Sequence, residues 1–164
     1  MTITGMWTWD IHRLIDYIQT REDANKNKIA CVGLSGGGLQ TLWASALDDR
    51  IRCAVISGYM YGYKESLLEM CTNCSCNYVP HLYEYLDMGD IAALIAPRPL
   101  LIETGTRDPL NGASGLRNVY SQTSIIRRSY KIMEKGKLFK HDVFEGDHRW
   151  HGVEAIPWIK KHLL

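Results

Sequence analysis

The chain has 164 residues, of which 46 % are hydrophobic and 23 % are charged, and its formal net charge is +1. This length suits one domain that buries its own core, and the balanced charge favours neither nucleic acid nor a membrane surface as a partner. The sequence contains no apolar run of about 18 residues, so no transmembrane helix is expected.

The first predicted helix covers residues 7–21 and follows a short lead-in at residues 1–5. One face of this helix is apolar at helical spacing, with Ile11, Leu14, Ile15 and Ile18. The polar residues 22–28 then predict a turn.

Residues 28–47 (KIACVGLSGGGLQTLWASAL) contain the most informative pattern in the chain. An apolar run predicts a strand, and a glycine-rich turn follows it. The helical spacing of the apolar residues after the turn predicts a helix, with Leu39, Leu42, Trp43, Ala46 and Leu47 on one side. The turn matches G-x-S-x-G within the strand–turn–helix context that this motif requires.

This context predicts that Ser35 is a nucleophile. A strained turn makes the serine hydroxyl project from the end of the sheet, and Gly33 and Gly37 leave room for neighbouring chain. The backbone N–H of Gly36 is expected to point at a developing oxyanion, and Gly38 is expected to let the helix pack closely on the sheet. The alternative interpretation is a glycine-rich turn that binds nothing.

The remaining elements complete an α/β pattern. Further strands are predicted at residues 51–57, 100–104 and 138–145, and the last of these alternates enough to lie near a sheet edge. Further helices are predicted at residues 89–96 and 115–135 and in a final segment that contains Val153, Ile156, Ile159 and Leu163. We therefore predict one domain over residues 1–164, with a parallel sheet of about four strands flanked by helices.

Residues 58–87 are irregular, rich in tyrosine, and contain a cluster of cysteines. The tyrosines either line a pocket or pack over the sheet. The CTNCSC stretch, with His81 nearby, is an incomplete set of zinc ligands, so no metal is predicted. Five cysteines, together with a first segment unlike a signal peptide, predict a reducing, cytoplasmic location.

Three residues with suitable chemistry follow predicted strands: Ser35, Asp108 and His148. Catalytic groups collect at the carboxyl ends of parallel strands, and this chain order is that of α/β-hydrolases. A histidine base activates a serine, and a carboxylate orients the imidazole. Taken singly, Asp108 before Pro109 is typical of a turn, and His148 is typical of a loop.

Two neighbours compete for these roles. His151 is the rival base, but it lies further past the strand end and near the start of the last helix. Asp147 is adjacent to His148, and a residue rarely orients the ring of its immediate neighbour. The basic residues between 127 and 140 are interpreted as a solvated helix face, because the chain as a whole is not basic.

These residues resemble the α/β-hydrolases, and among them the acetyl xylan esterase-like and dienelactone hydrolase-like bacterial esterases. The resemblance rests on the stretches WTWDIHRLIDYIQTR, GLSGGGLQTLWASALDDRI, CNYVPHL, IAPRPLLIETGTRDPLNG and FEGDHRWHG. It implies that Ser35 is the nucleophile, His148 the general base, Asp108 its partner and the Gly36 N–H an oxyanion donor. It also implies a serine hydrolase that cleaves small acyl esters without a cofactor, with sugar deacetylation as one activity of the group.

The resemblance covers the C-terminal part of such a domain. Complete members have further strands before the elbow strand, and a loop there supplies the second oxyanion donor. Without those strands, the strand that begins at Ile29 is expected to be unpaired on one side and to favour self-association, or a chain that supplies the other half. Two other functions stay open: a peptidase on the same fold, and a catalytically silent fragment that acts as an association module.

Overall fold

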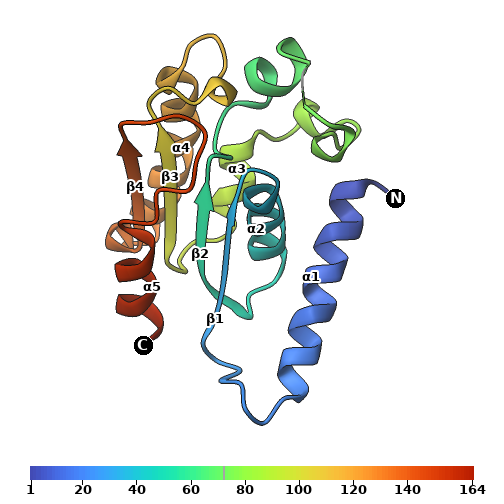
Figure 1. The fold of residues 1–164 in the computed structure, drawn as a ribbon, viewed down its shortest axis with the longest axis vertical. Helices are drawn as coiled ribbons and strands as arrows, with labels where there is room; N and C mark the ends of the chain where they lie inside the picture. Colours follow the sequence, from blue (N-terminus) through green and yellow to red (C-terminus); the bar gives the residue numbers. More distant parts are fainter. Residues whose placement is uncertain (72) are drawn as a thin grey trace.

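The computed structural model describes residues 1–71 and 73–164. Its sheet contains the four strands β1 (Ile29–Leu34), β2 (Ile51–Ser57), β3 (Leu100–Gly105) and β4 (Phe139–Phe144). The strands lie in the order β1-β2-β3-β4, and every neighbouring pair is parallel. The predicted fold class, a parallel sheet of about four strands flanked by helices, is therefore confirmed (Figure 1).

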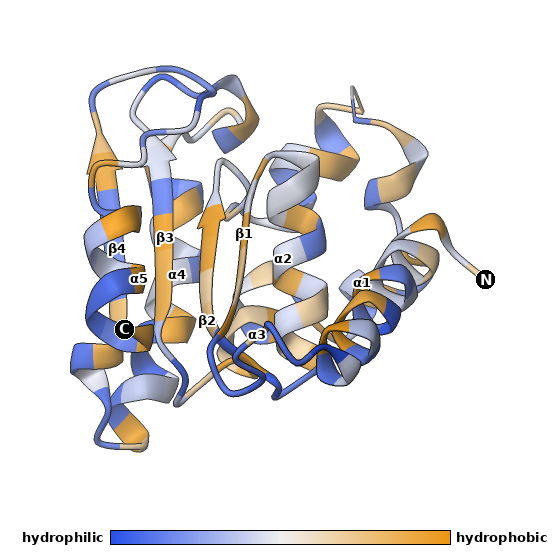
Figure 2. Cartoon of the chain, turned by 60° about the horizontal axis from the view of Figure 1, so that its bottom comes forward, coloured by the Kyte–Doolittle hydropathy of each residue, from blue (hydrophilic) through white to orange (hydrophobic). Residues whose placement is uncertain are grey.

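Helices cover both faces of the sheet. Alternate strand residues point to opposite sides, so each face presents apolar side chains that a helix can bury. On one face, Ala54 and Ile56 join a core with residues of α2 (Gly36–Leu47), α3 (Met88–Ala93) and α4 (Leu116–Ile132). On the other face, Cys53 and Val55 pack against Trp158 of α5 (Ala155–Leu163). Strands β2 and β3 are almost continuously hydrophobic in Figure 2, as expected where both faces are covered.

The two ends of the chain differ from the sequence predictions. The N–H of Gly5 donates to Thr2 Oγ1 at 3.1 Å, so this cap starts α1 (Ile3–Thr20) within the predicted lead-in. At the other end, α5 begins at Ala155, and Val153 and Ile156 are 63 % and 53 % exposed. Val153 therefore lies outside the last helix, in which it was predicted, and packing on the sheet buries Ala155 and Trp158.

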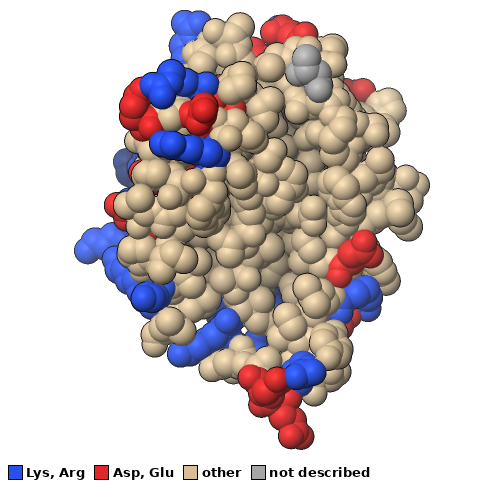
Figure 3. Space-filling model, in the orientation of Figure 1, with Lys and Arg blue, Asp and Glu red and all other residues tan. Residues whose placement is uncertain are grey.

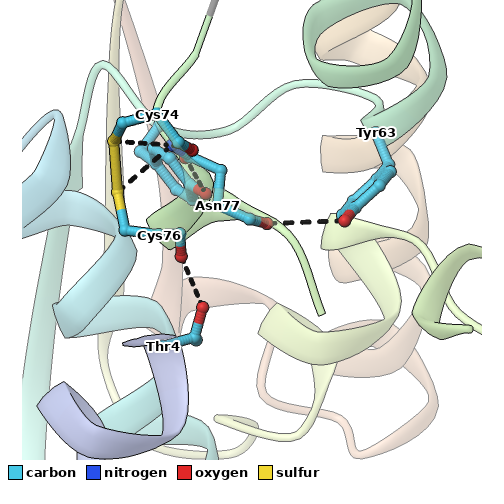
Figure 4. The surroundings of a disulfide bond; sticks show 6 residues. Thr4, Tyr63, Cys74, Cys76 and Asn77 are labelled. Carbon is cyan, nitrogen blue, oxygen red and sulfur yellow. Dashed lines mark hydrogen bonds between the residues drawn. A yellow bond between two sulfur atoms is a disulfide. The ribbon is translucent and has the colours of Figure 1, made fainter. Parts of the chain in front are cut away.

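The irregular segment after β2 packs against the start of α1. Within it Cys74 and Cys76 form a disulfide, and Thr4 Oγ1 of α1 donates to the Cys76 carbonyl oxygen at 2.5 Å (Figure 4). Asn77 lies beside the disulfide and accepts a hydrogen bond from the Tyr59 hydroxyl at 2.7 Å. The predicted cytoplasmic location stays a prediction.

Strand β1 lies at an edge of the sheet. Among the described residues it pairs with β2 alone, and its Val32 is 43 % exposed, whereas β3 is buried along its whole length. The predicted open side of the Ile29 strand is thus present in this chain. No helix in the described part of the chain is both long enough and apolar enough to cross a membrane.

Helix α2 passes very close to the strand that precedes it. A Cβ atom on Gly33 would lie 2.2 Å from the carbonyl carbon of Gly37, and one on Gly38 would lie 2.7 Å from Tyr59 Cβ. A Cβ on Gly37 would meet nothing within 4 Å. Positions 33 and 38 therefore require glycine, because a side chain there would collide with neighbouring atoms. Position 37 has room for a side chain, and its backbone is what approaches Gly33.

We expect Gly33→Ala to lower the free energy of unfolding by about 3 kcal/mol, because backbone on both sides of the contact must move. Gly37→Ala is the matched control, and it should raise stability by about 0.5–1 kcal/mol because alanine favours the helix. Urea unfolding of both variants measures the difference. Equal midpoints for the two variants would contradict the close passage.

Candidate active site

Ser35 forms the junction between β1 and α2. Its backbone has φ 57° and ψ −117°, a conformation that residues with a side chain rarely adopt. Its N–H donates to the carbonyl oxygen of Ser57 at 3.0 Å, which ties the junction to the end of β2. The serine is half-buried. Local strain of this kind is typical of functional positions, provided that the surrounding structure holds it in place.

Asp108 and His148 come together from two other strand ends. Asp108 follows β3, and His148 lies in the loop between β4 and α5. The Nδ1 of His148 and the Oδ2 of Asp108 are hydrogen-bonded at 2.7 Å. The other carboxylate oxygen of Asp108 accepts the N–H of Leu110 at 2.9 Å, and its side chain is only 2 % exposed. Both oxygens of the carboxylate thus have donors, and the imidazole is held in a defined orientation.

Gly58 locates this pair relative to Ser35. A Cβ on Gly58 would lie 3.0 Å from His148 Cε1 and 3.1 Å from Leu34 Cδ1. The imidazole therefore lies over the end of β2, one residue after the Ser57 carbonyl that binds the Ser35 N–H. Among the hydrogen bonds of the described residues, none joins the Ser35 hydroxyl to His148. Such contacts are often long before a substrate binds.

Gly36 is the first residue of α2 and is exposed. The first N–H groups of a helix have no acceptor within the helix, so this N–H is available to a ligand. It is also adjacent to the positive end of the α2 dipole, which favours negative charge.

Tyr61 is a neighbour of this site that sequence analysis grouped only with the other tyrosines. Its hydroxyl is buried and has no hydrogen-bond partner among the described residues. Burial and, after it, the negative charge of Asp108 raise the pKa of Tyr61. The alternating tyrosines after β2 were the only sequence signal, and they did not distinguish Tyr61 from Tyr59 and Tyr63.

The rival residues lie elsewhere. His151 Nδ1 is hydrogen-bonded to Asp142 Oδ2 at 2.8 Å, and the His151 ring stacks on Phe144 with 4.3 Å between centroids. The side chain of Asp147 is 73 % exposed and points toward Arg149 rather than toward His148. Asp108 is thus the carboxylate that contacts His148.

Known proteins resemble this chain over part of their length. No protein-family model matches it. YtaP of Bacillus subtilis (strain 168), which is named as a hydrolase, is 32 % identical over 127 residues, which are 74 % of this chain and 42 % of YtaP. The carbohydrate esterase MZ0003 from an unknown prokaryotic organism is 28 % identical over 118 residues, which are 62 % of this chain and 27 % of MZ0003.

Solved structures of esterases share the fold. A glucuronoyl esterase of carbohydrate esterase family 15 from Caldicellulosiruptor kristjansonii superposes with a TM-score of 0.80 at 17 % identity, over 99 % of this chain and 51 % of the esterase. A protein from Bacteroides fragilis described as an acetyl xylan esterase gives 0.79 at 16 % identity, over 96 % of this chain and 48 % of that protein. The fold is α/β-hydrolase-like. The chain spans less than half the length of the two sequence relatives named above and about half of these structures.

The contact between Gly58 and His148 can be tested by Gly58→Ala. The added methyl would displace the imidazole by a few tenths of an ångström, because a Cβ at 3.0 Å from the ring is tighter than ordinary packing. Gly115→Ala is the matched control, since Gly115 has nearly the same φ, +55° against +57°, but nothing within 4 Å of an added Cβ.

Each alanine should cost about 1–2 kcal/mol for its backbone conformation. Only Gly58→Ala should also shift the NMR signals of the His148 ring, assigned with the help of His148→Gln. Unchanged ring signals in a folded Gly58→Ala protein would show that His148 does not lie over Gly58.

Proposed function

We propose that this chain carries the reactive residues of a carboxylic ester hydrolase. The observation that carries the proposal is the Asp108–His148 hydrogen bond of 2.7 Å, placed over the end of β2 beside the strained Ser35. Hydrolase and esterase names among the relatives, and the shared fold, support the same class of reaction.

In the proposed mechanism the Ser35 hydroxyl attacks the ester carbonyl while His148 takes the proton through its free Nε2. Asp108 holds the other ring nitrogen and stabilises the imidazolium that forms. The Gly36 N–H donates to the oxyanion of the tetrahedral intermediate. His148 then protonates the departing alcohol, and a water activated by the same histidine releases the acid and regenerates Ser35.

The proposed substrate is an ester of a carbohydrate, with acetylated sugars as the first class to try. The names of the carbohydrate esterase, the glucuronoyl esterase and the acetyl xylan esterase support this choice. A mostly apolar cavity of about 480 Å³ in the segment after β2 would offer the partly exposed rings of Tyr78 and Tyr83 to a sugar ring. This segment extends from the carboxyl end of β2, the end of the sheet at which Ser35 lies (Figure 1).

The proposal includes a contribution from further chain beside β1. Relatives extend well beyond the length that this chain matches, and α/β-hydrolases take their second oxyanion donor from a loop before the elbow strand. Loss of one such donor costs about a hundredfold to a thousandfold in rate. We therefore propose that the chain reacts slowly by itself and faster with its other half, which would pair along the open side of β1.

The first test is intact-mass analysis after treatment with a fluorophosphonate probe, which reports an activated serine without needing the natural ester. The wild-type chain should gain one adduct, and Ser35→Ala should gain none. Ser124→Ala, which removes an exposed helix serine, should label like the wild type. A folded wild-type chain without an adduct would refute the active-esterase proposal.

The same assay distinguishes Asp108, which contacts His148, from Asp147, which precedes His148 in the chain. Asp108→Asn should slow labelling by about three to four orders of magnitude, because the Asn oxygen stays with the Leu110 N–H and its NH2 faces His148 Nδ1, which moves the ring proton to Nε2 and removes the base. Asp147→Asn should label at the wild-type rate, since that side chain is exposed and points away from the ring. Equal rates for both variants would show that Asp108 does not act through His148.

A second candidate function, association through β1, is favoured by the open edge of the sheet. In Figure 3 the face that contains β1 is largely free of Lys, Arg, Asp and Glu across its middle. Unpaired strand edges without charge are prone to pair with another chain. This candidate function requires no reactive serine, so it is compatible with a chain that gains no fluorophosphonate adduct.

We expect the wild-type chain to sediment as a dimer or larger species at micromolar concentration. Val32→Lys places a charge on the exposed part of β1 and should give a monomer. Ile132→Lys is the control, because Ile132 is an exposed apolar residue at the end of α4, away from β1, and this variant should sediment like the wild type. A monomeric wild-type chain would contradict association through this edge.

A further inference from the structure

A second group of ionisable side chains lies behind the loop that carries His148. Glu103 on β3 and Asp142 on β4 are register partners on neighbouring parallel strands. His151 approaches them from the loop after β4, and one ligand atom from each of the three residues lies within 4.8 Å of the others. We call these three residues the β3–β4 cluster.

The charges of this cluster are not balanced by the protein. Glu103 is fully buried, its Oε1 accepts the N–H of Gly152 at 2.9 Å, and its Oε2 has no hydrogen-bond partner among the described residues. Asp142 bonds to His151, and none of the ion pairs in the described chain joins either carboxylate to a lysine or arginine. Like charges opposite each other on neighbouring strands are destabilising, and a buried carboxylate oxygen without a donor costs more.

We propose that the β3–β4 cluster binds a divalent transition-metal ion, with zinc as the best-suited probe. Two carboxylate oxygens and one imidazole nitrogen form a ligand set that zinc accepts, and two positive charges would neutralise the two carboxylates. In a tetrahedral site, zinc–ligand distances of about 2.0–2.2 Å place two ligand atoms about 3.3–3.6 Å apart. The separations of up to 4.8 Å therefore require the side chains to close by up to about 1.5 Å when the ion binds.

The ion would have a structural role. His151 lies three residues after His148, and Gly152, whose N–H binds Glu103, follows directly. A metal that joins His151 to β3 and β4 would fix the base of the loop that holds His148 against Asp108. None of the three ligands contacts the reacting groups, so this inference stands whether or not the chain is an esterase.

The test is isothermal titration of Zn²⁺ into the full chain, together with its melting temperature with and without Zn²⁺. We expect one ion per chain and a rise in melting temperature of about 5 °C at a hundredfold excess over the dissociation constant. Glu103→Gln keeps the acceptor for Gly152 but removes the charge, and it should weaken binding by more than about a hundredfold. Asp142→Asn should do the same.

The matched control is Glu84→Gln. Glu84 is an exposed carboxylate that pairs with His81 at 2.6 Å, as Asp142 pairs with His151, so its variant should bind Zn²⁺ like the wild type. Cys71→Ser should also bind normally, and the Co²⁺ form should lack a thiolate charge-transfer band. These two results would separate the β3–β4 cluster from a site at the free thiol of Cys71.

Three results would overturn the inference. They are a wild-type chain that binds no Zn²⁺, a Co²⁺ spectrum with thiolate ligation, and undiminished binding by Glu103→Gln or Asp142→Asn. A wild type without binding, combined with a Glu103→Gln protein that melts higher, would show that a proton rather than a metal balances the cluster.

Discussion

The close passage of α2 over the end of β1 is the constraint on which the proposed site depends. The chain must turn from strand to helix at Ser35, and the backbone of Gly37 then lies directly over Gly33. This geometry gives Ser35 its positive φ and directs its N–H to the Ser57 carbonyl. The next residue after that carbonyl is Gly58, whose missing side chain leaves the space that the His148 ring occupies. One steric requirement thus positions the serine and the histidine together.

The parallel sheet brings the remaining groups to the same end. Each strand ends in a loop at its carboxyl edge, so residues far apart in sequence meet there. The loop after β4 serves two neighbours: His148 reaches Asp108 beyond β3, and His151 reaches Asp142 on β4 itself. The register of β3 and β4 sets Glu103 opposite Asp142, which concentrates charge beneath that loop. The proposed metal would convert this local destabilisation into a support for the histidine.

The open side of β1 is the part of the sheet that has no strand partner among the described residues. Strands β2 and β3 are covered by neighbours and helices, whereas β1 has a partner on one side only. Parallel sheets are normally covered on both faces, whereas Val32 of β1 is 43 % exposed, and the proposed association through β1 would cover this residue. The relatives extend far enough to supply such a cover, and a second copy of this chain would be another.

Several features followed from the sequence because they depend on neighbouring residues. Apolar runs marked the first three strands, partial alternation marked the fourth, and the glycine-rich turn marked the strand–helix junction around Ser35. Helix ends were less predictable: the Thr2 cap and the burial of Trp158 in place of Val153 depend on local hydrogen bonds and on packing against the sheet. The Cys74–Cys76 pair was likewise not evident from spacing.

The sequence by itself determined the fold class, the order of the elements and the residue types at the strand ends, because periodicity and turn chemistry are local properties. Only the tertiary structure decided which carboxylate meets which histidine, pairing Asp108 with His148 and Asp142 with His151. It alone showed that Glu103, hidden in an apolar strand, faces Asp142 with an oxygen that has no donor. Those contacts arise from strand register and loop path, which join Asp108 to His148 across 40 positions and Asp142 to His151 across 9, and they leave no trace in local sequence.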